Sequence, residues 1–155
     1  MIKHILNFKQ PSGTSRGVLT SKETFFLVIE QEDKKGIGEC NLFRGLSADD
    51  VPDYEAKLQW VEQHLHLGEK ALLEELKTFP SIQFGVEQAF RSVAAPHWYE
   101  LFPSNFTKGK DAIPINGLIW MGSPDSMKAQ IKEKLAQGFR CIKMKIGAID
   151  FEEEY

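Results

Sequence analysis

Hydrophobic and polar residues alternate at the start of the chain, in the pattern of a half-buried β-strand. Residues 2–9 alternate in this way, and residues 24–31 are rich in β-branched and aromatic side chains. Residues 37–43 form a third candidate strand after a turn at residues 33–36, so the last two strands predict a hairpin. Residues 11–22, with their Pro, Ser and Gly, predict a loop.

Apolar residues take a helical spacing after residue 50. Asp50-Val51-Pro52 predicts a cap and a first turn, and a shorter helix is expected near residues 69–77. Ser81 is expected to cap a third helix that ends before Pro96. The predicted buried positions are Tyr54, Leu58, Val61 and Leu65 in the first helix and Ile82, Val86, Ala89, Phe90 and Val93 in the third.

A strand–helix–strand pattern begins near residue 112. Residues 112–122 predict a buried strand, Ser123-Pro124 begins a helix, Gly138 ends it, and residues 140–147 predict a second strand. This is a βαβ unit, whose two strands should be parallel. The apolar positions of its helix are Met127, Ile131 and Leu135.

The end of the chain predicts a further helix, with Asp150 as its cap and Glu152, Glu153 and Glu154 in its first turn. A parallel sheet needs more than two strands and cover on both faces. We therefore expect the chain to be a truncated protein or an N-terminal fragment.

Composition narrows the class of protein. The 155 residues are 42% hydrophobic and 26% charged, which is ordinary for a globular domain with a buried core. A net charge of -3, without a block of basic residues, argues against nucleic acid as a partner. Cys40 and Cys141 form neither a disulfide framework nor a zinc motif. Without a signal peptide or an apolar run of roughly 20 residues, we expect a cytoplasmic protein with no membrane contact.

Lys143 and Lys145 are the strongest candidates for chemistry. Side chains alternate along a strand, so both lysines share one face while Ile142 and Met144 share the other. In a parallel α/β sheet the apolar face meets helices, and active sites lie at the carboxyl ends of the strands. Two neighbouring ammonium groups repel each other, which depresses a lysine pKa toward the range of a general base. The alternative is an antiparallel strand whose lysines simply face water.

Four stretches carry a family resemblance, in this order: PSGTSRGVL, GIGECNLFRGLSADD, PINGLIWMG and FRCIKMKIG. They resemble the o-succinylbenzoate synthases, in the muconate-lactonizing subgroup of the enolase superfamily, over essentially the whole chain. The resemblance implies an α+β capping domain over residues 1–110, made of a three-stranded antiparallel meander plus helices. Residues 111–155 would then be the first β/α units of a truncated (β/α) barrel.

The resemblance also implies a reaction. Family members are carbon–oxygen lyases of menaquinone biosynthesis that dehydrate 2-succinyl-6-hydroxy-2,4-cyclohexadiene-1-carboxylate to o-succinylbenzoate. The second lysine of the K-x-K motif, here Lys145, removes the proton alpha to the carboxylate, with Lys143 as its charged neighbour. A divalent metal, usually magnesium, stabilises the enediolate. Its acidic ligands lie on later barrel strands, so this chain is expected to hold no metal ligand and to be inactive alone.

The substrate is expected to be a small carboxylate, and the resemblance implies where it would bind. Arg16, in a loop bracketed by glycines, would fold over the barrel mouth and meet the carboxylate. Leu46 and Ser47 would lie in a second such loop, although Ser47 could equally begin a capping turn. Trp120 and Met121, at the end of the first barrel strand, would line the pocket or belong to the core.

Other functions stay open from the sequence. The same K-x-K base serves N-succinylamino acid racemases, dipeptide epimerases and cycloisomerases of the superfamily. A different class is a non-catalytic, stand-alone domain that binds a partner or a second copy of itself.

The first prediction concerns self-association. Strands such as those with Leu118, Trp120 and Met144 would leave apolar surface and open edges if no further barrel strands cover them. We expect the purified chain to self-associate, as measured by light scattering, or its residues beyond about 110 to be poorly ordered. A monodisperse monomer with residues 112–147 protected from hydrogen exchange would contradict this expectation.

Overall fold

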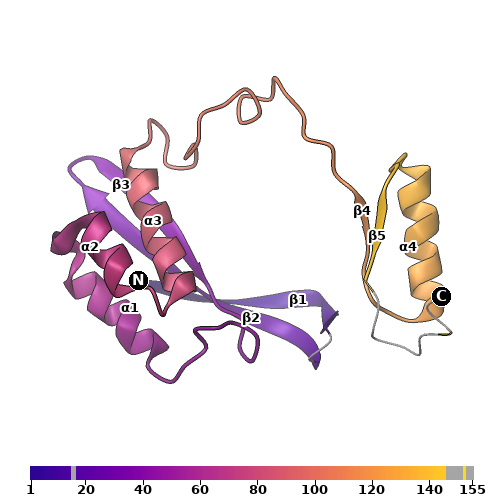
Figure 1. Ribbon diagram of the computed structural model, residues 1–155, viewed down its shortest axis with the longest axis horizontal. Helices are drawn as coiled ribbons and strands as arrows, with labels where there is room; N and C mark the ends of the chain where they lie inside the picture. Colours follow the sequence, from indigo (N-terminus) through magenta and orange to yellow (C-terminus); the bar gives the residue numbers. More distant parts are fainter. Residues whose placement is uncertain (15–16, 146–151, 153–155) are drawn as a thin grey trace. The chain divides into compact units, whose positions relative to one another are not determined.

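The computed structural model describes residues 1–14, 17–145 and 152 (Figure 1). Arg16 and the predicted helix start at Asp150, Glu153 and Glu154 lie outside the described residues. The chain divides into two compact units: residues 1–7 with 21–108, and residues 8–20 with 109–155.

Three antiparallel strands open the chain, in the sheet order β1-β2-β3. They are β1 (Ile2–Thr14), β2 (Gly17–Gln31) and β3 (Lys34–Asn41). The predicted hairpin is confirmed, with Phe25 opposite Cys40 and Ile29 opposite Gly36. Its turn places Glu32 at φ 55°, in the left-handed region.

The predicted loop over residues 11–22 was wrong. β1 continues to Thr14 and β2 already begins at Gly17, so most of this segment is an extended two-stranded ribbon. Pro11, Ser12 and Gly13 are turn formers by intrinsic preference. Pairing with a neighbouring strand supplies backbone hydrogen bonds that this local preference does not reflect, and it prevails here.

Helices pack beside this sheet in the first unit. They are α1 (Tyr54–Gln63), the short 3-10 helix η1 (Leu65–Leu67), α2 (Gly68–Glu75) and α3 (Pro80–Ala94). Their predicted apolar faces are largely buried. The shared core consists of Phe25, Leu27, Cys40, Leu42, Tyr54, Leu58, Val61, Leu72, Leu76, Ile82, Val86 and Ala89.

Two predicted helix caps have other roles. α1 begins at Tyr54, and Asp50 instead accepts the backbone N–H of Gly45 at 2.6 Å. α3 begins at Pro80, and Ser81 donates both its N–H and its hydroxyl to the buried carboxylate of Asp49, at 2.8 and 2.7 Å. Both carboxylates fix the loop before α1, a tertiary role that cap statistics do not contain.

The glycines of β3 allow α3 to lie directly against the sheet. A Cβ added to Gly38 would overlap the backbone carbonyl of Gly85 in α3, and one added to Gly85 would overlap the sulfur of Cys40. Burial raises the pKa of the Cys40 thiol to about 12, so this cysteine stays protonated and serves packing. Figure 1 shows α3 running across the sheet beside β3.

The second unit contains the predicted βαβ arrangement. Its elements are β4 (Gly117–Ile119), α4 (Pro124–Ala136) and β5 (Ile142–Met144), and β4 and β5 are parallel. The Ser123 hydroxyl caps α4 by accepting the N–H of Ser126 at 3.3 Å. Gly138, at φ 82°, follows the helix end in the left-handed conformation that favours glycine.

Two details of this unit differ from the prediction. β4 is shorter than residues 112–122, because Pro114 cannot donate to a ladder and Ile113 and Ile115 are exposed. In α4, Met127 is buried but Leu135 is 58% exposed, so the predicted apolar stripe is covered at one end only. Among the helices that the structure describes, none has the length and apolar character needed to cross a membrane.

We predict that Gly38→Ala destabilises the first unit by about 1–3 kcal/mol, because the new methyl group must push α3 away from β3. The free energy of unfolding in urea measures the effect. Gly13→Ala is the matched control, since a Cβ there meets no atom within 4 Å. Equal unfolding midpoints for the two variants would contradict this account of the contact.

Candidate functional site

Lys145 lies at the carboxyl end of the parallel pair. Its N–H donates to the carbonyl of Ile119 at 3.1 Å, which continues the ladder one residue past β5. Its Nζ lies 4.1 Å from the centroid of the Trp120 ring. An ammonium group at this distance from an indole face makes a cation–π interaction.

The two faces of the β4–β5 pair differ in character. A Cβ on Gly117 would meet Ile142 of β5, Phe139 and Lys134, and Lys134 belongs to α4. The helix therefore covers the face that carries Gly117 and Ile142. Strand alternation puts Lys143 and Lys145 on the opposite face. Lys143 pairs in register with Leu118 and is exposed. This is the arrangement that the alternation of residues 142–145 predicts.

A pocket of about 740 Å³ lies in the second unit, and we call it the Trp120 pocket. Its volume is in the usual range for small-molecule sites. It is lined by Gln10, Pro11, Ser12, Trp120, Met121, Gly122, Ser126 and Gln130. The structure thus brings two predicted substrate-binding residues, Trp120 and Met121, to the same pocket as the ribbon formed by β1 and β2.

Sequence reasoning did not single out Gln10, Ser12 or Gln130. The family resemblance indicated that the segment from Pro11 onward covers the barrel mouth, which points to the neighbourhood of Ser12. Nothing in the spacing of α4 distinguishes Gln130 from its other polar residues.

Leu46 and Ser47 lie in the first unit, in the loop before α1, and both are half-buried. The hydroxyl of Ser47 accepts the N–H of Phe43 at 2.9 Å, and the N–H of Ser47 donates to the carbonyl of Phe43 at 2.9 Å. Ser47 therefore ends a short turn that begins at Phe43, whereas the sequence suggested the start of a helix-capping turn; α1 begins only at Tyr54. Its contact with a substrate stays a prediction, as does that of Leu46.

A charge network holds this loop. Arg44 donates to Glu23 at 2.7 Å and to Asp50 at 2.8 Å, and Lys3 lies 3.3 Å from Glu23. The Arg44 hydrogen bond, reinforced by Lys3, lowers the pKa of Glu23. The Gly45 N–H and then Arg44 lower the pKa of Asp50.

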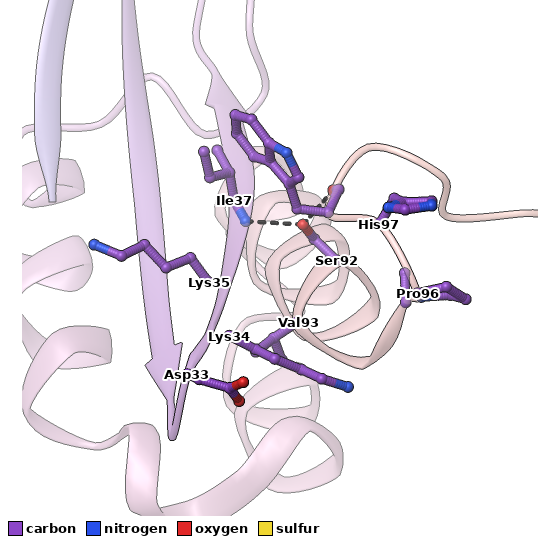
Figure 2. Close-up of a pocket in the computed structure, with 10 residues that line it drawn as sticks. Asp33, Lys34, Lys35, Ile37, Ser92, Val93, Pro96 and His97 are labelled. Carbon is purple, nitrogen blue, oxygen red and sulfur yellow. Dashed lines mark hydrogen bonds between the residues drawn. The ribbon is translucent and has the colours of Figure 1, made fainter.

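A second pocket, of about 530 Å³, lies in the first unit beside the β2–β3 turn and the end of α3 (Figure 2). Ser92 at its centre accepts the N–H of Ile37 at 3.0 Å and donates its hydroxyl to the carbonyl of Trp98. Both bonds tie the end of α3 to β3. The serine is thus used in packing, and the charged or titratable side chains that line the pocket are Asp33, Lys34, Lys35 and His97.

The described residues hold no cluster of potential metal ligands. No group of three or more His, Cys, Asp or Glu side chains among them could hold an ion.

No protein-family model matches the chain. The o-succinylbenzoate synthase of Desulfotalea psychrophila is 36% identical over 96% of this chain and 49% of its own length. The crystal structure of MenC from the same organism matches with a TM-score of 0.70 and 28% identity, over 98% of this chain and 50% of that one. The predicted resemblance to the o-succinylbenzoate synthases of the enolase superfamily is confirmed.

Other solved structures extend the likeness in fold. The magnesium-bound o-succinylbenzoate synthase of Thermosynechococcus elongatus matches with a TM-score of 0.67 at 21% identity, over 99% of this chain and 44% of that one. The L-Ala-D/L-Glu epimerase of Bacillus subtilis gives a TM-score of 0.67 at 16% identity, over 99% and 45%. The predicted fold class, a capping domain followed by the first units of a barrel, is confirmed. The chain spans about half the length of these relatives.

The charge network around Arg44 predicts a sensitivity to acid. Glu23 and Asp50 have lowered pKa values in the folded state, so their stabilising effect is present above the unfolded values of about 4.3 and 3.9. That effect is lost as the pH falls through the folded values. At pH values below about 4, we expect the first unit to unfold at a lower temperature. We expect Arg44→Gln to weaken this dependence of the unfolding temperature on pH.

Arg91→Gln is the control, because Arg91 makes an exposed ion pair with Glu87 on α3, away from this loop. It should keep the wild-type dependence of unfolding temperature on pH. Identical pH profiles for Arg44→Gln and the wild type would refute the assignment.

Proposed function

We propose that this chain forms the base-bearing part of an o-succinylbenzoate synthase-like lyase of menaquinone biosynthesis. The proposed substrate is 2-succinyl-6-hydroxy-2,4-cyclohexadiene-1-carboxylate, which loses water to give o-succinylbenzoate. The observation that carries the proposal is the position of Lys145. It ends a parallel strand on the face away from α4 and lies over Trp120, a wall of the Trp120 pocket. The 36% identity to a named o-succinylbenzoate synthase supports the choice of reaction.

The proposed chemistry gives Lys145 two proton transfers. Its neutral amine takes the proton alpha to the substrate carboxylate, and the resulting ammonium returns that proton to the departing hydroxyl, which leaves as water. Lys143, on the same face, adds positive charge near the carboxylate. One base can thus serve both steps of an elimination.

A lysine alone does not make such a proton acidic enough. A divalent metal, usually magnesium, supplies the missing stabilisation of negative charge in the whole enzyme, and a structural relative is described as having Mg in its active site. Residues 1–14 and 17–145 offer no set of ligands for this ion. The steps assigned here are therefore only those that the Lys145 nitrogen performs.

Substrate contacts follow from the same proposal. Trp120 and Met121 would form the apolar wall of the pocket, as their position there supports. Arg16 would pair with a substrate carboxylate, and Leu46 and Ser47 would close the second side of the mouth. These last three roles rest on the family resemblance.

An epimerase or racemase is the alternative within the superfamily. The same K-x-K base serves these reactions, and the L-Ala-D/L-Glu epimerase of Bacillus subtilis matches this chain in fold with a TM-score of 0.67. At 16% identity that likeness concerns the fold alone. Parallel assays of dehydration and of dipeptide epimerization would separate the two reactions.

The decisive test is a chimera in which these 155 residues replace the matching half of the Desulfotalea psychrophila enzyme. We expect the chimera to dehydrate the substrate, and Lys145→Ala to lower kcat by about 10³-fold or more, because a general base is lost. Lys128→Ala, which removes an exposed lysine of α4 from the same unit, is the control and should retain activity.

The 155-residue chain assayed by itself, with magnesium, should show no turnover, since the described residues provide no metal-binding group. Clear turnover by this chain alone would contradict that expectation. Near-normal activity of the Lys145→Ala chimera would overturn the proposed function.

A further inference from the structure

We infer that Gln130 is a positioning residue for the proposed base, acting on Lys145 through Trp120. This inference rests on the proposed function for its chemical meaning, since it concerns the same lysine. The contacts that support it, between Gln130, Trp120 and Lys145, all lie within the second unit.

The side-chain amide of Gln130 binds both backbone groups of Trp120. Its Oε1 accepts the N–H of Trp120 at 2.8 Å, and its Nε2 donates to the carbonyl of Trp120 at 3.1 Å. A single planar amide thus makes the two bonds that a neighbouring strand would make. Both ends of the amide are occupied, so the bonds fix the peptide groups on either side of Trp120.

The alternation of the ladder explains why Trp120 needs such a partner. Gly117 donates to the carbonyl of Cys141 and Ile119 accepts from the N–H of Lys145, so these odd positions point their polar groups toward β5. The backbone groups of Trp120, the next residue, point to the opposite edge. Within the described residues no strand lies on that edge, and Gln130 from α4 takes its place.

Fixing this backbone anchors the side chain whose ring Lys145 contacts. The indole of Trp120 is attached to the peptide groups that Gln130 holds, and its face lies 4.1 Å from Nζ of Lys145. The indole Nε1 is itself buried and has no hydrogen-bond partner among the described residues, so this polar atom does not orient the ring there. The ring is therefore placed by the backbone to which it is attached and by the packing around it, and the position of the ammonium group follows the ring.

A base must be held within hydrogen-bond reach of the proton that it takes, and a lysine has four rotatable side-chain bonds. A cation–π contact restricts that freedom without occupying the donors of the ammonium group. Gln130 would thereby restrict the range of positions of Lys145 while touching neither the lysine nor the substrate. The same contact also places the ammonium beside the Trp120 pocket, which Gln130 itself lines.

The test uses the 155-residue chain with ¹³C-labelled lysine side chains, observed by NMR. Protons above an aromatic face are shielded, so the ε-methylene protons of Lys145 should resonate upfield of those of exposed lysines such as Lys128. The resonance that is missing in Lys145→Arg identifies Lys145. We expect Trp120→Leu to abolish the upfield displacement and Gln130→Leu to remove most of it.

Gln137→Leu is the matched control. Gln137 caps the same helix, and its amide bonds to Glu133 at 2.8 Å and to Lys134 at 3.1 Å, away from Trp120. It should leave the Lys145 resonance in place. If Gln130→Leu does not fold, Gln130→Glu keeps the acceptor for the Trp120 N–H but loses the donor to its carbonyl, and a reduced displacement then supports the inference.

Two results would overturn it: a wild-type Lys145 resonance at the position of exposed lysines, or a full displacement retained in a folded Gln130 variant. The measurement needs no turnover. A negative result therefore leaves the base assignment to the activity assay, and an inactive chimera leaves the contact of Gln130, Trp120 and Lys145 intact.

Discussion

In the second unit, Gly117 pairs with Ile142 and Ile119 with Met144, and this parallel register decides which side chains leave the strands on each face. Because side chains alternate, the same register that gives Ile142 to α4 gives Lys145 to the other face, beside Trp120. A slip of one residue would turn the lysine toward the helix and an apolar side chain toward the pocket. The candidate site therefore depends on the hydrogen bonds of only a few residues.

The first unit depends on a different constraint, the close approach of α3 to β3 at glycines. Gly38 and Gly85 leave no room for a side chain, which brings a helix carbonyl against the strand. The same close packing of α3 against β3 explains why the Cys40 thiol is buried. The sequence Gly36-Ile37-Gly38, which resembles part of a nucleotide-binding fingerprint, thus has a packing explanation.

Local sequence signals predicted the bounds of helices and strands better than they predicted the tertiary contacts of the residues that carry those signals. Ser123-Pro124 and Gly138 mark the ends of α4 correctly, because caps and left-handed glycines act within one turn of the chain. Ser81 and Asp50 carry equally good signals, yet Ser81 is engaged by Asp49, 32 residues away, and Asp50 by the turn at Gly45. The turn formers of β1 are likewise engaged by pairing with β2. Leu135 shows the same limit, since a helical stripe is buried only where something covers it.

The residues of the candidate site also differ in whether a local rule or only a tertiary contact reveals them. The lysine pair and Trp120 are visible in the sequence because strand alternation is a local rule, whereas Gln130 is not, because its role requires α4 to lie at a particular height beside β4. A glutamine on a helix usually faces water, and only the tertiary contact shows that its amide replaces a strand.

Among the described residues, the contacts of Lys145 come from residues 117–145, while the proposed chemistry would need stabilisation of negative charge from elsewhere in the family pattern. Under the proposed function, placement of the base and activation of the proton would thus be physically separable. A chain that folds over these residues can hold the lysine in position without performing the reaction.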